Sequence, residues 1–500
     1  GIPMTDINWH ERLKNTPLSV RNLINGEFSA PQGDKIIEKY APHNGSLLYS
    51  FGEGTAQEVD LAVASAREAF DDGRWRNKSV DERQAILNKL ADLVEENSEQ
   101  FGLFECLDVG KPIMMGVHDD VGRGVGQLRG AAAGLDNLLL PSGVSGNDMA
   151  YQYRKPVGVV AGIVGWNYPL ALAAGKIGPA LAMGNSIVLK PSEFTSLSAI
   201  RLAELALEAG VPPGVINVIH GSGATVGAAL SSHMDVDMIT FTGSSATGKV
   251  IMAAAGNSNM KRVHLECGGK SANIIFEDCI ADIDHVVASS VYWSFPNQGA
   301  LCITGSRLLI QESIKDEFMA KMLEETAKIK PQDILDPSCE FGAMMNEAHM
   351  NKVLGYIDSG KSEGAKLLCG GNQVNKDSGG FYIEPTIFDN VTMDHRIARE
   401  EIFGPVLSVF SFKDEAEALA IANDTRFALA AHVTTRDLGR AHRMGQQLNA
   451  GMIMISGSAN GIGGFVNLGV EPQKESGMGF EGGRAGLEAY SVASSIHMFI

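Results

Sequence analysis

Cys302 is the residue whose type and surroundings point most directly to chemistry. It follows the glycine-broken turn 295–301 and lies between a helical pattern at 282–293 and a strand-like run at 306–310. A thiolate attacks carbonyl carbon, and a loop position lets a substrate reach it. A free cysteine is more often a small buried hydrophobe. This segment alone therefore leaves a catalytic and a structural interpretation open.

Candidate phosphate- and ribose-binding turns precede Cys302. The sequence has no G-x-G-x-x-G motif at a strand-to-helix turn, and the nearest substitutes are 221–227 and 243–248. The second opens a helical pattern, so its N–H groups could face an anion. Lys190 and Glu193 follow a strand-like run, at the edge where ligands bind open α/β sheets. A carboxylate there would bind a ribose diol and repel a 2′-phosphate, which favours NAD over NADP; a solvated Glu193 is an equal alternative.

Short apolar runs alternate with helical patterns in two successive parts of the chain. The first part has strand-like runs at 157–164, 186–189, 215–219, 238–241 and 262–265, with helices at 169–183, 196–208, 225–232 and 246–255. The second has strand-like runs at 306–310, 406–410, 428–433 and 451–455, with helices at 313–329, 347–359, 414–422 and 438–447. Two amphipathic helices, 56–72 and 79–100, precede both parts. Apolar strands separated by helices indicate parallel sheets covered on both faces. We therefore predict an α/β fold with two doubly wound parallel-sheet domains that meet near 266–271.

Composition and charge disfavour several classes of function. The net charge of -18 argues against nucleic acid as a partner, because its binding needs a basic surface. The sequence lacks a run of the roughly 18 apolar residues that a membrane helix needs, so we predict no membrane span. Cysteines and histidines do not recur at metal-ligand spacing, and we predict no metal site. The 6 cysteines are too sparse for a disulfide framework and the N-terminus lacks a secretory signal, so we expect a cytoplasmic protein.

Six motifs, in order along the chain, make it similar to one family. They are Gly165-Trp-Asn-Tyr-Pro169, Leu189-Lys-Pro-Ser-Glu193, Phe241-Thr-Gly-Ser244, Leu265-Glu-Cys-Gly-Gly-Lys270, Asn297-Gln-Gly-Ala-Leu-Cys302 and Glu400-Glu-Ile-Phe-Gly-Pro405. Through them the chain resembles the NAD(P)-dependent aldehyde dehydrogenases of the hydrolytic type, from about residue 20 to residue 490. The resemblance implies oxidation of an aldehyde to the carboxylic acid, with NAD as cofactor and NADP possible.

The resemblance also implies the roles of the catalytic residues. Cys302 matches the family's nucleophile, which forms a hemithioacetal and, once hydride has left, a thioester. The side-chain amide of Asn167 and the N–H of Cys302 match the donors that stabilise the oxyanion. Glu266 matches the base that activates water for thioester hydrolysis. Lys176 and Glu481 match positions that support proton movement near the site.

Cofactor contacts are implied in the same way. Glu401 matches the carboxylate that holds the nicotinamide ribose, with Phe403 beside it, while Lys190 and Glu193 match the contacts to the adenosine ribose. The predicted cofactor-binding set is Trp166, Lys190, Glu193, Gly223, Gly243, Ser244, Glu401 and Phe403.

The resemblance divides the chain into three parts. Residues 1–137 and 157–266 form the NAD-binding domain, and 267–468 form the catalytic domain. Residues 138–156, which read as a strand-turn-strand excursion, and the apolar segment 487–500 form an oligomerisation arm. We therefore expect a homodimer or homotetramer.

The predicted substrate tunnel is mostly apolar. Its members are Tyr168, Trp293, Phe295, Ile303 and Phe465. Asp119 and Asp120, near the same route, favour an aldehyde with an amino or trimethylammonio tail. The family's late substrate-mouth motif is divergent at 468–477 and does not specify the substrate. Cys267 replaces a usual leucine, and we expect it to be inert core, with oxidative pairing to Cys302 as the alternative.

Four alternative functions remain at this point. One is a broad-specificity aliphatic or aromatic aldehyde dehydrogenase. A coenzyme-A-acylating relative is disfavoured by Glu266, which serves hydrolysis. A semialdehyde enzyme would need arginines near the tunnel to bind a carboxylate, and only Arg123 and Arg129 lie in the nearby predicted helix. A catalytically silent structural relative is disfavoured by the presence of Cys302 and Asn167.

Overall fold

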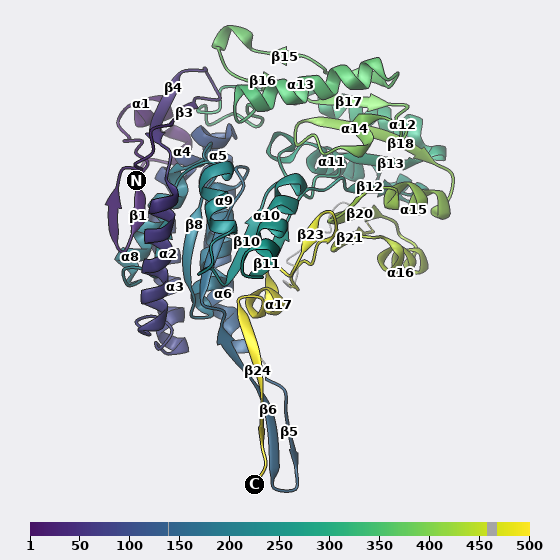
Figure 1. Cartoon of the computed structure of the whole chain (residues 1–500). Helices are drawn as coiled ribbons and strands as arrows, with labels where there is room; N and C mark the ends of the chain where they lie inside the picture. The colour runs from purple at the N-terminus through teal and green to yellow at the C-terminus, as the bar shows by residue number, and fades with distance from the viewer. Residues whose placement is uncertain (139, 458–467) are drawn as a thin grey trace.

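Two large sheets, which follow each other along the chain, form the framework of the protein (Figure 1). The computed structural model describes residues 1–138, 140–457 and 468–500. In spatial order the first sheet contains β2 (Glu27–Ser29), β1 (Asn22–Ile24), β9 (Ile216–Val218), β8 (Ser186–Lys190), β7 (Val159–Ile163), β10 (Met238–Thr242), β11 (Arg262–Glu266) and β23 (Gly477–Met478). The second contains β14 (Lys366–Cys369), β17 (Thr386–Asp389), β18 (Val406–Phe412), β13 (Arg307–Gln311), β12 (Ala272–Ile275), β20 (Ala430–Thr434) and β21 (Met452–Ser456). Strands β9 to β11 of the first sheet and β17 to β21 of the second run parallel, which confirms the predicted doubly wound α/β fold.

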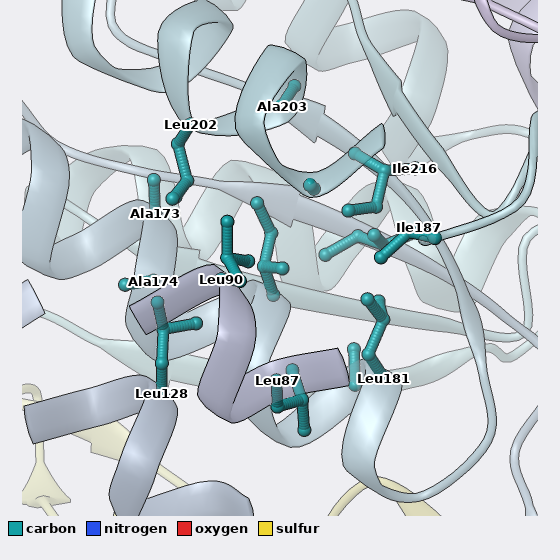
Figure 2. Packing of buried hydrophobic residues seen from close by; sticks show 14 of the residues in the cluster. Leu87, Leu90, Leu128, Ala173, Ala174, Leu181, Ile187, Leu202, Ala203 and Ile216 are labelled. Carbon is teal, nitrogen blue, oxygen red and sulfur yellow. The ribbon is translucent and has the colours of Figure 1, made fainter. Parts of the chain in front are cut away.

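Helices cover the first sheet because each presents an apolar stripe to it. Figure 2 shows this packing, with side chains from α3 (Val80–Glu96), α6 (Val121–Gly134), α7 (Pro169–Ala182) and α8 (Leu197–Ala209) in one cluster with those of β8 and β9. Leu87, Leu90, Leu128, Leu181 and Ile187 are fully buried there. Burial of one such side chain contributes roughly 1.5–3 kcal/mol to the free energy of folding. The cluster therefore stabilises the packing of the helices on the strands whose ends carry the site.

The predicted helix 79–100 is confirmed at its start but ends too late. Its first part is α3, which begins after the capping box between Ser79 and Glu82; a separate helix, α4 (Ser98–Val109), begins after Asn97. Asn97 leaves the helical backbone (φ −106°, ψ 24°), and its side chain donates to the Leu93 carbonyl. This local hydrogen bond competes with the helical ladder, as is common for asparagine at a helix end.

The remaining long helices agree with the predicted ranges to within a few residues. They are α2 (Ala56–Asp71), α10 (Ser245–Asn257), α11 (Ile283–Ser294), α12 (Lys315–Ala327), α13 (Glu347–Ser362), α15 (Glu415–Asn423) and α16 (Leu438–Gln447). The predicted helix 225–232 is instead a π-helical turn at Gly223–Gly227 that continues into α9 (Ala228–Ser231). Among the described residues, no helix is both long and apolar enough to cross a membrane.

The predicted strand-turn-strand excursion forms an arm that projects from the body of the protein (Figure 1). It contains β5 (Ser142–Ser145) and β6 (Asp148–Pro156), and the C-terminal strand β24 (Ser491–Met498) pairs antiparallel with β6 of the same chain. The last residues stay outside the core, since Phe499 and Ile500 are 82% and 85% exposed. The role of the arm in assembly remains a prediction.

Candidate active site

The nucleophile loop, residues 295–306, joins α11 to β13 and carries Cys302. Asn297, Gln298 and Gly299 have left-handed backbone, with φ of 51°, 57° and 83°. Residues other than glycine rarely adopt this region, so tertiary contacts must hold them there. Asn297 Nδ2 donates to a carbonyl three residues further on at 2.9 Å, and Gln298 Oε1 accepts a backbone N–H from the segment before α13 at 2.8 Å. These bonds fix the peptide that leads to the thiol.

Replacing Gly299 by alanine is expected to disrupt this loop. A Cβ at Gly299 would lie 2.0 Å from the carbonyl oxygen of Gly404, and the φ of 83° strains any L residue. We expect a loss of about 3 kcal/mol in the free energy of unfolding, or a displaced loop with activity lowered by about a hundredfold. Urea denaturation and steady-state kinetics measure both effects. Gly130→Ala in α6 is the control, because a Cβ there meets no atom within 4 Å and should be neutral or slightly stabilising.

Asn167 is held beside the nucleophile loop. It lies in the turn between β7 and α7, and its Nδ2 donates to the Ala300 carbonyl at 3.1 Å, two residues before Cys302. Its main-chain carbonyl accepts from Lys111 Nζ and from Asn297 Nδ2, each at 3.1 Å. Hydrogen bonds from the side-chain amide and to the main-chain carbonyl therefore hold Asn167 in place. Within the described residues the second N–H of Nδ2 has no acceptor, so it can donate to an oxygen that develops charge near the thiol.

Glu266, the last residue of β11, lies near a charge pair of which Lys176 is buried and Glu481 is partly exposed. Lys176 Nζ of α7 is 3.5 Å from Glu481 Oε1, and all three side chains line one small cavity. In the described part of the chain, Glu266 Oε1 is buried and has no hydrogen-bond partner. Burial raises the pKa of Glu266 well above its usual value, the negative charge of Glu481 raises it further, and Lys176 lowers it. A carboxyl with a raised pKa can exchange a proton near neutral pH.

Cys302 is half-buried and faces acidic groups. Burial is the main cause that raises the pKa of its thiol, and the charges of Glu266, Glu401 and Glu481 raise it further. Without ligand the thiol is therefore held neutral and protected from oxidation. A base must take the proton when the thiolate forms, and after burial the charge of Glu266 has the largest effect on the pKa of this thiol.

The strand ends of the first sheet bring the predicted cofactor residues to one edge. Ile163 of β7 pairs in parallel with Lys190 of β8 and with Phe241 of β10. Thr242, one residue later in β10, pairs with Glu266 of β11. Neighbouring strands lie about 4.8 Å apart, so these carboxyl ends form one continuous row. Ligands bind open α/β sheets along such a row.

Side chains just after these strand ends suit a dinucleotide. Lys190 Nζ lies 3.7 Å from Glu193 Oε2, which leaves a carboxylate at the sheet edge for a ribose diol. Ser244 caps α10 by accepting from the Thr247 N–H, next to Gly243 in the turn after β10. The first turn of α10 thus directs free N–H groups toward a phosphate. Gly223 lies in the turn after β9, where a Cβ would meet nothing within 4 Å.

Glu401 and Phe403 lie beside the nucleophile Cys302. Both line a small cavity with Cys302 and Gly269, and the Gly269 N–H donates to Glu401 Oε2 at 2.8 Å. Phe403 has left-handed backbone (φ 61°), and its ring lies edge-on to Trp166 with 5.2 Å between centroids. Burial raises the pKa of Glu401, although a second carboxylate oxygen stays available for a ribose hydroxyl. The residues present therefore fit the nicotinamide end of NAD.

The predicted tunnel residues separate into two groups. Tyr168 is buried next to Asn167, and the Trp293 ring is 4.6 Å from that of His432, whose Nε2 bonds the Ile303 carbonyl at 2.9 Å. Tyr168 and Trp293 thus flank the nucleophile loop, and Ile303 belongs to it. Phe295, in contrast, is buried in the core of the second sheet with side chains of α11 and α12. Phe465 lies outside the described residues.

The two acidic residues near the predicted tunnel differ in their surroundings. Asp120 forms an ion pair with Lys111, and both side chains are fully buried. Asp119 is exposed on the surface. Of the two carboxylates that the sequence argument invoked for a cationic aldehyde tail, Asp120 is therefore neutralised and Asp119 is exposed to solvent.

Cys267 packs in the apolar core beneath α10. Its Sγ would lie 2.8 Å from a Cβ at Gly248, and its thiol is free. Burial raises its pKa to about 12. These observations favour the interpretation of an inert core residue over pairing with Cys302.

Sequence reasoning missed several residues that support the site. Lys111 and Asn297 fix Asn167, and His432 binds the nucleophile loop. A single lysine after a predicted helix is usually solvated, and an isolated histidine in a strand is usually a core residue, so neither pattern marks a role. Only the Gly110-Lys111-Pro112 turn, in an otherwise apolar segment, is a local signal.

Comparisons with known proteins agree with this geometry. The family model described as the aldehyde dehydrogenase family matches residues 28–496. The chain is 42% identical over 494 residues to the NADP/NAD-dependent aldehyde dehydrogenase PuuC of Escherichia coli, covering 98% of this chain and 97% of that protein. It is similar, with a TM-score of 0.96 and 42% identity over 100% of both chains, to an indole-3-acetaldehyde dehydrogenase in complex with NAD+. It is also similar to a gamma-glutamyl-gamma-aminobutyraldehyde dehydrogenase from Burkholderia cenocepacia, with a TM-score of 0.95, 40% identity and 99% of each chain covered.

Proposed function

The chain belongs to the aldehyde dehydrogenase family, and from that membership we propose that it oxidises a small aldehyde to the carboxylic acid through a covalent intermediate on Cys302. One observation carries the proposal: the Asn167 amide donates a hydrogen bond to the Ala300 carbonyl, two residues before Cys302. The negative charge of Glu266, from a third segment of the chain, raises the pKa of the Cys302 thiol. NAD is the cofactor, as in the similar structures, and NADP is an alternative as in the bacterial relative.

Cys302 attacks the aldehyde carbon, and the Sγ–C bond forms as the carbonyl oxygen takes up the electron pair. The oxyanion accepts hydrogen bonds from Asn167 Nδ2 and from the Cys302 N–H. Such a donor contributes roughly 3–4 kcal/mol of transition-state stabilisation in acyl-transfer enzymes. The thiol proton passes to Glu266, whose raised pKa makes it a suitable acceptor.

When bound, NAD supplies the hydride acceptor, and Glu401, Phe403, Trp166 and Ser244 would hold it against the site. Glu266 first releases the thiol proton toward Lys176 and Glu481; its carboxylate then removes a proton from water, and the resulting hydroxide attacks the thioester on Cys302. The C–S bond breaks, the carboxylic acid leaves, and the thiolate takes the proton back from Glu266. Lys176 and Glu481 line the cavity behind Glu266 and provide the path for its proton.

The most informative first experiment is an aldehyde panel with NAD and NADP in parallel, followed by absorbance of the reduced cofactor. We expect turnover with small aldehydes, including those with an amino or amide group as in the relatives, and a preference for NAD because Glu193 opposes a 2′-phosphate. Absence of turnover with every aldehyde and both cofactors would favour the catalytically silent alternative.

The pH dependence of hydrolysis should follow Glu266. Only the ionised carboxylate accepts a proton, so where hydrolysis limits turnover kcat rises with pH through the raised pKa of this group. Removing the negative charge in Glu481→Gln should lower that pKa and move the midpoint of the kcat profile to lower pH. Removing the positive charge in Lys176→Met should move it to higher pH. Midpoints that do not move, or move the other way, would assign the titration to another group.

We also propose the assembly and location expected from the sequence. The three-stranded arm and its exposed apolar end support a homodimer or homotetramer, which size-exclusion chromatography with light scattering can distinguish. All six cysteines are free, which is compatible with a reducing cytoplasm.

A further inference from the structure

His264 lies on the same face of β11 as Glu266. Side chains two residues apart in a strand point to the same face, so Arg262, His264 and Glu266 form one row along β11. Arg262 is exposed, His264 is half-buried, and Glu266 ends the row with its Oε1 atom buried. The row therefore leads from solvent to the carboxyl group that serves as base in the proposed function.

The His264 side chain lines the small cavity behind Glu266. Lys176 and Glu481 line the same cavity, and their charged groups lie 3.5 Å apart. Thr240 of β10, which is the register partner of His264 in the sheet, lines it as well. An imidazole thus shares one cavity with the amine and the two carboxyl groups of the proposed proton path.

Nδ1 of His264 is buried and, among the described residues, has no hydrogen-bond partner. The ring packs against the backbone of Gly479, where a Cβ would lie 2.1 Å from Nδ1. Gly479 lies two residues before Glu481, so Nδ1 faces the segment that carries this carboxylate. A neutral imidazole can accept a proton at one ring nitrogen while the other carries hydrogen. His264 therefore offers the cavity a ring nitrogen that no other described group uses.

The charges around the cavity keep His264 neutral. Burial, together with the positive charges of Lys176 and Arg262, lowers the pKa of His264 to about 4. The imidazole is therefore unprotonated near pH 7 and able to accept a proton. When the Lys176 ammonium gives up its proton, one of the charges that oppose protonation of His264 disappears. The affinity of His264 for a proton thus rises as that proton is transferred.

The proposed reaction leaves one proton at the site in each turnover. The aldehyde, NAD+ and water give the carboxylic acid, NADH and H+, and the thiol is restored. This proton is the one that Glu266 takes from Cys302 and releases toward Lys176 and Glu481. It has to leave the cavity in every turnover, because otherwise Glu266 would stay protonated and could not activate water.

We propose that His264 passes this proton from the Lys176–Glu481 pair to solvent. Nδ1 takes up the proton in the cavity, and the half-buried imidazolium then releases a proton to water outside. Only N–H bonds form and break, so the step needs no further reactant. This inference rests on the proposed function and adds a residue to its proton path.

Chemical rescue of His264→Ala tests the proposal. In ~2 mM buffer we expect steady-state kcat to fall about a hundredfold, the lower end of what a proton-transfer group contributes. Imidazole added at ~50 mM should restore most of the rate, because it fits the space left by the side chain and titrates near neutral pH. The rate constant of the first NADH burst should stay within about twofold, since Glu266 takes up the first proton itself. The kcat of the wild-type enzyme should not depend on the buffer concentration.

Two further variants complete the test. His264→Gln keeps a polar side chain that cannot take up and release a proton, so kcat should fall similarly and the solvent deuterium isotope effect on kcat should increase. KM for the aldehyde and the dissociation constant for NAD should change by less than about twofold in both His264 variants. His442→Gln, at an exposed histidine of α16, is the matched control and should leave kcat unchanged in weak and strong buffer.

The outcomes separate this inference from the proposed function. Wild-type kcat for both His264 variants in weak buffer overturns the role of His264 and assigns the exit to Glu481, whose side chain is 35% exposed. A lowered kcat that imidazole does not restore in His264→Ala also overturns it, in favour of a structural role. If His264→Ala does not fold, kcat and the isotope effect of His264→Gln decide. Failure of the wild-type enzyme to oxidise any aldehyde instead contradicts the proposed function itself.

Discussion

Replacing Cys302 by alanine is expected to abolish aldehyde oxidation, with kcat lowered by on the order of 10⁴-fold or more. Without the thiol the aldehyde cannot form the tetrahedral adduct from which hydride leaves. Cys267 cannot replace it, because Cys267 is buried beneath α10 and its pKa is raised to about 12. The measurements are the steady-state rate of NADH formation and the amplitude of any burst in the first turnover.

Binding and folding should survive this substitution. Trp166, Glu401 and Ser244 contact neighbours other than the Cys302 side chain, so the dissociation constant for NAD, measured by calorimetry, should change by less than about twofold. Cys369→Ala is the matched control, because Cys369 is another half-buried free thiol, located in β14 away from the site, and its loss should leave kcat unchanged. Substantial turnover by the Cys302→Ala enzyme would exclude the covalent route.

Replacing Glu266 by glutamine is expected to stop the reaction after the thioester has formed on Cys302. Glutamine keeps the size of the side chain but cannot accept a proton, so water attacks the thioester too slowly. Steady-state kcat should fall by about a thousandfold, within the range that a general base contributes. Stopped-flow absorbance should show a burst of NADH close to the concentration of sites, and mass spectrometry should find the acyl group on Cys302.

The presence or absence of an NADH burst in the Glu266→Gln enzyme distinguishes two roles of Glu266. A burst followed by arrest assigns the carboxylate to hydrolysis. A slow reaction without a burst assigns Glu266 to removal of the proton from the Cys302 thiol, whose pKa the charge of Glu266 raises. Glu193→Gln is the control carboxylate at the same sheet edge, and it should raise KM for NAD with no acyl-enzyme accumulation.

Local pattern alone predicted most of the framework. A strand that is buried on both faces of a sheet needs apolar residues throughout, and amphipathic helices separate such runs. This pattern located β7, β8, β10 and β11 to within one or two residues. The apolar pattern does not predict a helix end that is determined by a single hydrogen bond. The side chain of Asn97 ends α3 by binding the Leu93 carbonyl, and the apolar periodicity of the segment carries no sign of this break.

The sequence by itself also determined the chemistry, because a thiol, an amide and a carboxyl in family motifs define a reaction wherever they meet. Only the tertiary structure decided which charged residues neutralise one another. Asp120 is paired with Lys111, and Arg129 is paired with Asp92. The physical reason is that Coulomb attraction depends on the distance between side-chain tips, and those tips come from segments that are adjacent only after folding.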